Sequence, residues 1–229
     1  MNIAIILLGG SSKRLNLNTP KQFIKLNDKE LFEYSLETFA KLDEIDQIIL
    51  VTGKNYYEHV YDIVNNKYSY KNINIVIGGE TRQESVFNAL SYLKDKVLDN
   101  DVVLIHDSSR PLVTSRIIID HLNALQKEEG TSTYVDIFDS IIMKENGYIK
   151  TYVPREDYFL VQTPQGFKFK DIYDVHEEMK NKNQLLFTDD ASLLVKKGKK
   201  IKLIYGDRFN FKITTLDDLM LLRSILEAN

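Results

Sequence analysis

Apolar residues follow two alternating patterns along the first half of the chain: short continuous runs, and segments with apolar residues at helical spacing. Short continuous runs are typical of strands buried on both faces, and the helical period indicates amphipathic helices. We therefore predict strands at residues 3–8, 47–52, 74–77 and 101–106, and helices at 31–41, 56–66, 84–93 and about 115–126. This alternation predicts an α/β fold with a mostly parallel sheet and helices on both faces.

The pattern changes after about residue 133, and residues 136–159 contain no convincing helical period. Two short runs, 140–144 and 148–153, flank Glu145-Asn146-Gly147, and an Asn-Gly pair in this position is a strong hairpin signal. An isolated hairpin is marginally stable in water. We therefore expect it to pack either on a second subunit, as an intermolecular arm, or back on its own domain.

Alternating elements return in the last third of the chain. We predict a strand that runs into residues 162–165, helices at 169–179, 190–196 and 215–227, and a strand at 201–205. No repeat, low-complexity tract or linker separates these elements. The expectation is one domain over residues 1–229, with a β-arm excursion at about 136–159.

Composition narrows the function classes. The 229 residues carry a net charge of −3, which argues against nucleic acid as the main partner and confines any cationic site to a local cluster. The absence of cysteine excludes disulfides, thiolate nucleophiles and cysteine-ligated zinc. No apolar run has the length of a membrane span, and the chain enters a strand at its start, so we expect a cytoplasmic protein without membrane attachment.

The first predicted strand ends in a loop whose composition suits phosphate. Gly9 and Gly10 are followed by small hydroxyl residues and by Lys13 and Arg14, and Lys21 comes shortly afterwards. Glycines allow close approach of the backbone, and successive free N–H groups can cradle phosphate oxygens. The alternative is an ordinary strand-to-helix turn with a solvated basic edge.

The position of two further loops favours the phosphate-binding interpretation. The loops at Gly78 and Asp107 also follow predicted strands. Ligand sites in α/β sheets lie beyond the carboxyl ends of the strands, so these loops can converge with the one at Gly9.

Common enzyme motifs are absent from the sequence: the chain has no P-loop, no dinucleotide-binding fingerprint and no nucleophile elbow. His106 is the one histidine near a candidate site, and we expect it to be packed and hydrogen-bonded rather than a base.

A series of polar loops in a defined order carries a family resemblance. The loops are residues 9–22, 78–85, 107–111, 154–155, 163–167, 188–192 and 210–214. This set resembles the 2-C-methyl-D-erythritol 4-phosphate cytidylyltransferase family and its close relative, the ribitol 5-phosphate cytidylyltransferases. The matches run over nearly the whole chain.

The resemblance implies a Rossmann-like, three-layer nucleotidyltransferase fold and a homodimer joined through an extended β-arm. It also implies a reaction in which CTP and a polyol phosphate give a CDP-polyol and pyrophosphate, with Mg²⁺ as the metal. The attacking group is then a substrate phosphate oxygen, which is already anionic, so the protein needs neither a nucleophile nor a strong base. Its task is alignment and charge stabilisation.

The resemblance assigns the catalytic roles to four cations. Arg14 and Lys21 match the pair that stabilises the transition state, and Arg155 and Lys212 match the residues that position the polyol phosphate. Nucleotide contacts are expected from Leu8, Gly9, Gly10, Gly79, Arg82, Ser85 and Asp107. Further substrate contacts are expected from Arg110, Ser140, Thr163 and Thr188.

Several of these residues have a second interpretation. Asp107 matches an aspartate near the ribose and the metal, although the nucleotide phosphates are expected to hold most of the Mg²⁺. Arg82 could instead form a salt bridge at a helix start, and Arg110 could pair with Asp107. Asp189 and Asp190 are expected to cap a helix rather than bind metal. By the resemblance, Ser140 and Arg155 lie on the arm and reach the neighbouring subunit's site.

Two alternative functions remain open at this stage. Gly9 favours ribitol phosphate as the acceptor, whereas the loops at 78–85, 163–167 and 188–192 favour methylerythritol phosphate. A protein that binds nucleotide without catalysis would keep the fold, but the presence of both Arg14 and Lys21 argues against it. We expect methylerythritol phosphate to be the acceptor.

Overall fold

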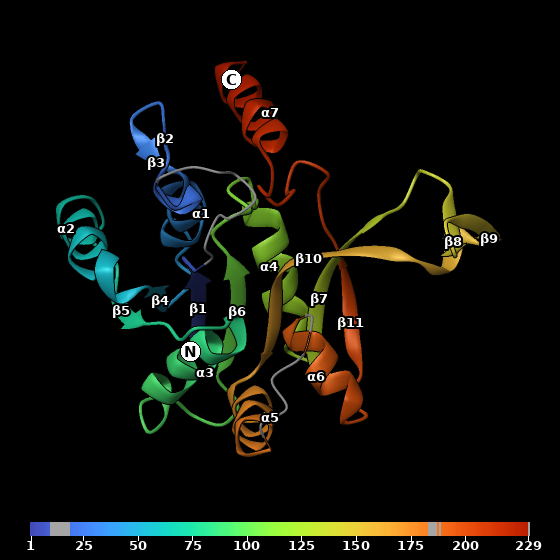
Figure 1. Cartoon of the computed structure of the whole chain (residues 1–229). Helices are drawn as coiled ribbons and strands as arrows, with labels where there is room; N and C mark the ends of the chain where they lie inside the picture. The colour runs from blue at the N-terminus through green and yellow to red at the C-terminus, as the bar shows by residue number, and fades with distance from the viewer. Residues whose placement is uncertain (10–18, 183–186, 188, 229) are drawn as a thin grey trace.

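One seven-stranded sheet forms the centre of the molecule (Figure 1). The computed structural model describes residues 1–9, 19–182, 187 and 189–228. Within these residues the strand order is β11-β7-β10-β6-β1-β4-β5. The strands are β1 (Asn2–Leu7), β4 (Gln47–Thr52), β5 (Ile73–Ile77), β6 (Val102–Asp107), β7 (Gly130–Asp136), β10 (Phe159–Lys168) and β11 (Ile201–Tyr205). Every pairing is parallel except those of β10 with β6 and β7, which confirms the predicted α/β class with a mostly parallel sheet.

Helices cover both faces of the sheet. One face packs on α1 (Leu31–Ala40), α2 (Tyr57–Lys67) and α4 (Ser115–Ala124), and the other on α3 (Arg82–Leu93), α5 (Phe169–Asn181) and α6 (Asp190–Lys196). Alternate residues of β1 pack on opposite faces of the sheet: Ile3 and Ile5 belong to one apolar cluster, and Ala4 and Ile6 belong to the other. This explains why the strand is a continuous apolar run, because neither face meets solvent.

A third, smaller cluster packs the C-terminal helix, α7 (Leu216–Glu227), against residues of the segment 24–34. Its buried members come from α7, from the short strand β2 (Lys25–Leu26), from Leu31 at the start of α1, and from Ile213. The short strand β3 (Lys29–Glu30) pairs with β2. The sequence did not predict β2 and β3, nor the 3₁₀ turns η2 (Lys21–Phe23) and η3 (Lys54–Tyr56), because two or three residues are too few to show a period. Ile24, directly after η2, packs in this cluster together with Phe211 and Ile213, the neighbours of Lys212 in the sequence.

Helix starts follow side-chain caps. Thr81 accepts a hydrogen bond from the N–H of Glu84, and the Glu84 carboxylate accepts one from the N–H of Thr81, so α3 begins at Arg82 rather than at the predicted residue 84. Thr215 and Asp218 form the same reciprocal arrangement at α7, where the sequence predicted the cap. Cations at a helix N-terminus are unfavourable, so Arg82 at the first position of α3 needs other support.

The hairpin projects from the body of the molecule (Figure 1). Strands β8 (Ile141–Glu145) and β9 (Tyr148–Val153) pair as a separate two-stranded sheet, close to the predicted boundaries. Asn146 and Gly147 both have positive φ, 52° and 89°, as the predicted Asn-Gly turn requires. The short turn η4 (Arg155–Asp157) then leads into β10.

Two parts of the sheet differ from the sequence prediction. Residues 163–167 were expected to form a loop but lie inside β10, and β7 was not predicted. Pro164 lies where the pairing of β10 with β7 shifts register, between Gln162 and Gln165, so its missing N–H interrupts no regular ladder. In β7, the buried Thr131 and Thr133 form hydrogen bonds with the ring of His121, so the strand is buried without an apolar pattern.

Among the described residues, no helix combines the length and apolar character needed to cross a membrane.

Candidate active site

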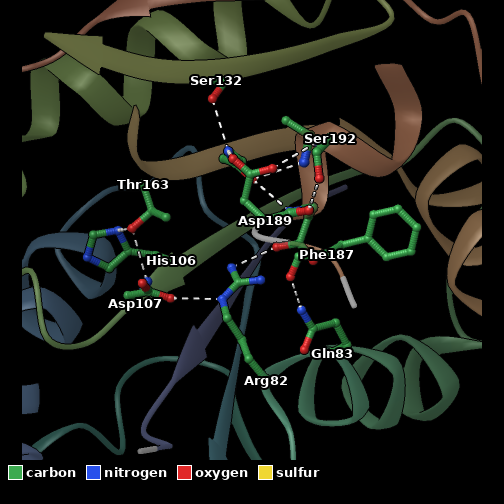
Figure 2. A network of polar contacts seen from close by, with 12 residues as sticks. Arg82, Gln83, His106, Asp107, Ser132, Thr163, Phe187, Asp189 and Ser192 are labelled. Carbon is green, nitrogen blue, oxygen red and sulfur yellow. Dashed lines mark hydrogen bonds and ion pairs between the residues drawn. The ribbon is translucent and has the colours of Figure 1, made fainter. Parts of the chain in front are cut away.

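A cluster of charged side chains lies at the carboxyl end of β6 (Figure 2). Asp107, the last residue of β6, is only 12% exposed at its side chain. Its Oδ1 lies 3.3 Å from Nε of Arg82, and its Oδ2 lies 2.7 Å from Nζ of Lys212. Three segments that are distant in the sequence therefore meet at one carboxylate, as expected at this edge of an α/β sheet.

Arg82 lies between two carboxylates. Its Nη2 lies 2.7 Å from Oδ2 of Asp190, the first residue of α6, while its Nε faces Asp107. These two carboxylates supply the support that the cation needs at the start of α3. The sequence expectation that both aspartates cap α6 holds for Asp189, whose Oδ1 accepts the N–H of Ser192, but is wrong for Asp190.

The electrostatics of the cluster favour ionised groups. Burial by itself raises the pKa of Asp107, but the charges of Arg82 and Lys212 outweigh it and hold the pKa well below its usual range. Burial likewise opposes ionisation of Asp190, yet Arg82 and a hydrogen bond from His176 lower its pKa to about 2. Burial by itself lowers the pKa of Arg82, but the charges of Asp190 and Asp107 raise it by more. The net effect is a raised pKa, so the guanidinium stays charged. The cluster therefore contains fixed charges of both signs at neutral pH.

Lys21 reaches the same region from η2. Its Nζ donates a 2.6 Å hydrogen bond to the carbonyl of Ile213, the residue after Lys212. The N–H of Ile213 in turn donates to the carbonyl of Ser109, two residues beyond Asp107. Lys21 and Lys212 thus lie in the same region as Asp107 in the structure.

The start of the glycine loop is fixed by the residue after Lys21. Gln22 is buried, and its Nε2 donates a 2.6 Å hydrogen bond to the carbonyl of Leu8. Leu8 is buried and Gly9 is exposed, so the chain leaves the core between these two residues. The remaining predicted residues Gly10, Arg14 and Thr188 lie outside the described residues.

A chain of buried hydrogen bonds connects β10 to the loop after β6. The N–H of Asp107 donates to Oγ1 of Thr163, which lies 3.1 Å from Nδ1 of His106, and Nε2 of His106 lies 3.1 Å from the carbonyl of Arg110. A carbonyl only accepts, so Nε2 carries the proton and the Thr163 hydroxyl donates to Nδ1. Burial lowers the pKa of His106 to about 4, which keeps the ring neutral. His106 is therefore a packed, hydrogen-bonded residue, as expected.

Arg110 does not pair with Asp107, contrary to one of the two interpretations of its role. Its guanidinium donates to the carbonyls of Asn210 and Val161, at 2.9 and 3.2 Å. Burial lowers the pKa of Arg110. This side chain joins the loop after β6 to the segment that leads to Lys212, so it shapes the site.

The segment after β5 is built on a close approach that only glycine allows. The N–H of Gly79 donates to Oγ of Ser85, and that hydroxyl donates to the carbonyl of Thr81. A Cβ at Gly79 would lie 2.3 Å from Cβ of Glu84. The predicted nucleotide-recognition residues Gly79 and Ser85 therefore form one unit with Arg82 at the start of α3.

The arm residues lie apart from this cluster. Ser140 is exposed just before β8, and Arg155 is exposed in η4, where its Nη1 donates to the carbonyl of Phe138. Within the part of the chain that the structure describes, neither one forms a hydrogen bond or ion pair with Asp107 or Lys212. The part of the chain that is described also contains no group of three or more acidic or histidine residues arranged to hold a metal ion.

Solved structures with this architecture identify the class of protein. A crystal structure titled 4-diphosphocytidyl-2C-methyl-D-erythritol synthase from Anaerococcus prevotii superposes with a TM-score of 0.83 at 30% identity, covering 99% of this chain and 98% of that one. The fold with its charged carboxyl edge is thus that of an α/β nucleotidyltransferase.

Sequence comparison then gives the family. The model of the family described as IspD, 2-C-methyl-D-erythritol 4-phosphate cytidylyltransferase, matches residues 2–228. A protein of this name from Thermosipho melanesiensis is 38% identical over 97% of this chain and 96% of its own length, and one from Clostridium botulinum is 40% identical over 99% and 97%. The chain belongs to this family, which confirms the resemblance seen in the sequence.

Proposed function

We propose that the protein transfers CMP from CTP to 2-C-methyl-D-erythritol 4-phosphate, giving CDP-methylerythritol and pyrophosphate. The observation that carries the proposal is the convergence of Lys21, Lys212 and Asp107 at the carboxyl edge of a nucleotidyltransferase sheet. Family membership and the names of the relatives support the same reaction. A cytoplasmic location and a single catalytic domain with an arm belong to this proposal.

The chemistry fits a site made of cations. The substrate phosphate oxygen attacks the α-phosphorus of CTP, and the bond from that phosphorus to the pyrophosphate oxygen breaks. Charge on the phosphoryl oxygens is stabilised by positive groups held in place before the reaction, each worth a few kcal/mol in a water-poor site, or about 10²–10³ in rate. In this proposal Lys21 and Arg14 serve the α-phosphate, and Lys212 binds the acceptor phosphate.

The nucleotide contacts follow from the loops at the strand ends. Leu8, Gly9 and Gly10 hold the triphosphate, and the unit of Gly79 and Ser85 receives cytosine and ribose. Arg110 and Thr163 then complete the walls near Asp107, and Thr188 adds a polar contact to the acceptor.

Mg²⁺ is part of the proposed reaction. Magnesium sites in such enzymes use one or two carboxylates together with substrate phosphates. Asp107 fits this requirement because it is an ionised carboxylate beside Lys212, at the carboxyl end of β6. When bound, the ion would offset charge on the triphosphate.

The arm suits a second copy of the chain. Its apolar residues are exposed, with Ile142, Ile149 and Tyr152 at 45%, 55% and 66%. Apolar side chains gathered on a projecting hairpin are typical of an interface. In the proposed homodimer, Ser140 and Arg155 reach the acceptor phosphate in the partner's site.

The structure also bears on the ribitol phosphate alternative. Gly9, the residue that favoured it, has open space around its Cβ position among the described atoms, and its φ is not in the positive range. An alanine at position 9 would meet none of the described atoms, so the described residues give no steric reason for a glycine there.

An acceptor panel tests the proposal. The purified protein is incubated with CTP, Mg²⁺ and either methylerythritol phosphate or ribitol phosphate, and pyrophosphate release is followed. Methylerythritol phosphate should give the higher kcat/KM. Release with ribitol phosphate alone would identify the alternative enzyme, and CTP binding without release from either acceptor would identify a non-catalytic nucleotide-binding protein.

A further inference from the structure

A buried histidine contacts the charged cluster through Asp190. His176 lies on α5 and is 2% exposed, and its Nε2 lies 3.1 Å from Oδ1 of Asp190. No role follows for it from the reaction proposed above. Its contact with Asp190 nevertheless connects it to Arg82 and, through Arg82, to Asp107.

Asp190 is held from two directions. Gln165, fully buried in β10, accepts the backbone N–H groups of Asp190 and Ala191 at its Oε1, both at 3.1 Å. His176 fixes Oδ1 of the Asp190 side chain. With backbone and Oδ1 both fixed, Oδ2 has one orientation, and that orientation meets Nη2 of Arg82 at 2.7 Å.

Arg82 depends on this contact more than an ordinary surface arginine would. It begins α3, where the helix N-terminus disfavours a cation. Its Nη1 is buried and has no hydrogen-bond partner among the described residues. The two carboxylates are therefore what hold the guanidinium in place, and Asp107 is the one shared with the candidate site.

We propose that His176 and Asp190 are positioning residues that orient Arg82 against Asp107 and thereby set the affinity of the site for CTP. This inference rests on the proposed function. Neither residue touches substrate. His176 orients Asp190, Asp190 orients Arg82, and Arg82 keeps Oδ1 of Asp107 occupied, so that Oδ2 faces Lys212 and the ligand.

The test separates nucleotide binding from turnover. His176→Leu removes the hydrogen bond to Asp190 and should raise KM for CTP about tenfold, with kcat and KM for the polyol phosphate changed less than about threefold. His176→Gln keeps an amide nitrogen that can reach Asp190 and should restore most of the CTP affinity. Tyr173→Phe is the matched control, because it removes a hydrogen bond to Glu177 on the same helix without touching the network.

A structural role alone predicts a different result. If His176→Leu lowers the midpoint of thermal unfolding but leaves KM for CTP unchanged, or if His176→Gln fails to restore it, the proposal is wrong. Should His176→Leu not fold, Asp190→Asn provides a second route: it keeps the shape of the side chain but removes the charge opposite Arg82, and should also raise KM for CTP about tenfold or more.

The double variant decides whether the two residues act together. If both act through Arg82, His176→Leu combined with Asp190→Asn should weaken CTP binding no more than Asp190→Asn alone. If the fold-losses in CTP affinity of the two single variants multiply in the double variant, the inference is wrong. Equilibrium CTP binding by calorimetry supplies the same comparison without turnover. The two failures are distinguishable. A wild type that releases no pyrophosphate would reject the proposed function, and variants with unchanged CTP affinity would reject this inference.

Discussion

Nζ of Lys212 lies 2.7 Å from Oδ2 of Asp107, although the two residues are 105 positions apart in the chain. The carboxylate and the ammonium neutralise each other at the centre of the candidate site. In the proposed reaction, an acceptor phosphate that binds Lys212 would replace the Asp107 carboxylate as its partner. We therefore propose that Lys212 connects acceptor binding to the nucleotide side of the site.

Lys21→Ala should reduce kcat by about 10²–10³, since a cation that stabilises charge in the transition state contributes a few kcal/mol. CTP affinity should fall much less, because other groups hold the triphosphate in the ground state. Steady-state kinetics gives kcat, and calorimetry on the same preparation gives the CTP affinity. Equal losses in kcat and affinity would contradict a transition-state role.

Lys212→Ala should raise KM for the polyol phosphate about tenfold or more, because a charged hydrogen-bond donor to that phosphate is lost. It should also leave Oδ2 of Asp107 without its cation, so the unfolding free energy falls as well. Lys202→Ala on β11 is the control for loss of one positive charge, since Lys202 forms no ion pair with any described residue. A KM for the polyol phosphate that stays at the wild-type value would exclude Lys212 from acceptor binding.

Two glycine substitutions should have opposite outcomes. Gly79→Ala places a Cβ 2.3 Å from Cβ of Glu84 and must displace the start of α3, so we expect a stability loss of about 1–3 kcal/mol and weaker CTP binding. Gly9→Ala meets no described atom within 4 Å and should keep stability and acceptor preference. Urea unfolding and the acceptor panel measure both. A Gly9→Ala protein that switched acceptors would show that this position controls specificity.

Mixing two inactive variants should restore activity if the arm completes the partner's site. In a heterodimer of Lys21→Ala and Arg155→Ala subunits, one site combines both wild-type residues and the other lacks both. Random exchange should therefore recover about a quarter of the wild-type sites in a two-fold symmetric dimer. No recovery after verified subunit exchange would mean that Arg155 does not act across an interface.

Acid should destabilise the protein before the carboxylates titrate. Burial lowers the pKa of His106 to about 4 and that of His121 to about 3, from an ordinary value of 6.5. Each histidine then stays neutral in the folded state while the unfolded chain takes up a proton. The stabilisation is complete above pH about 6.5 and is lost as the pH falls toward 4, by about 2 kcal/mol for His106 between pH 7 and 5.

Urea unfolding at pH 7 and pH 5 tests this prediction. The wild type should be less stable at pH 5, and His106→Asn should show a smaller difference between the two pH values because one of the titrating groups is gone. A wild type of equal stability at both pH values would mean that the two rings are protonated in the fold.

Much of the fold could be predicted because burial on two faces leaves a clear trace in the sequence. Strands such as β4 and β11 were located at their observed boundaries, and α6 and the cap of α7 were placed correctly. β7 could not be found in this way, because its buried positions include two threonines and a serine that form hydrogen bonds with other segments. Such partners are visible only in three dimensions.

The candidate site shows the same division. Lys21, Asp107 and Lys212 were grouped from the loops that carry them, and the structure brings them together. Asp190 was interpreted as a helix cap because an acidic residue at a helix start is usually one. Only its burial and its contact with Arg82, about a hundred residues earlier in the chain, show that its side chain faces the sheet edge instead.

One strand carries both the root of the arm and a wall of the site. β10 begins at Phe159, next to the arm, and reaches Thr163 four residues later. The root of the arm and a residue beside the candidate site therefore belong to one strand, and Thr163 connects that strand to His106 and Asp107 through hydrogen bonds. In the proposed homodimer, a displacement of the arm would act on the strand that carries Thr163.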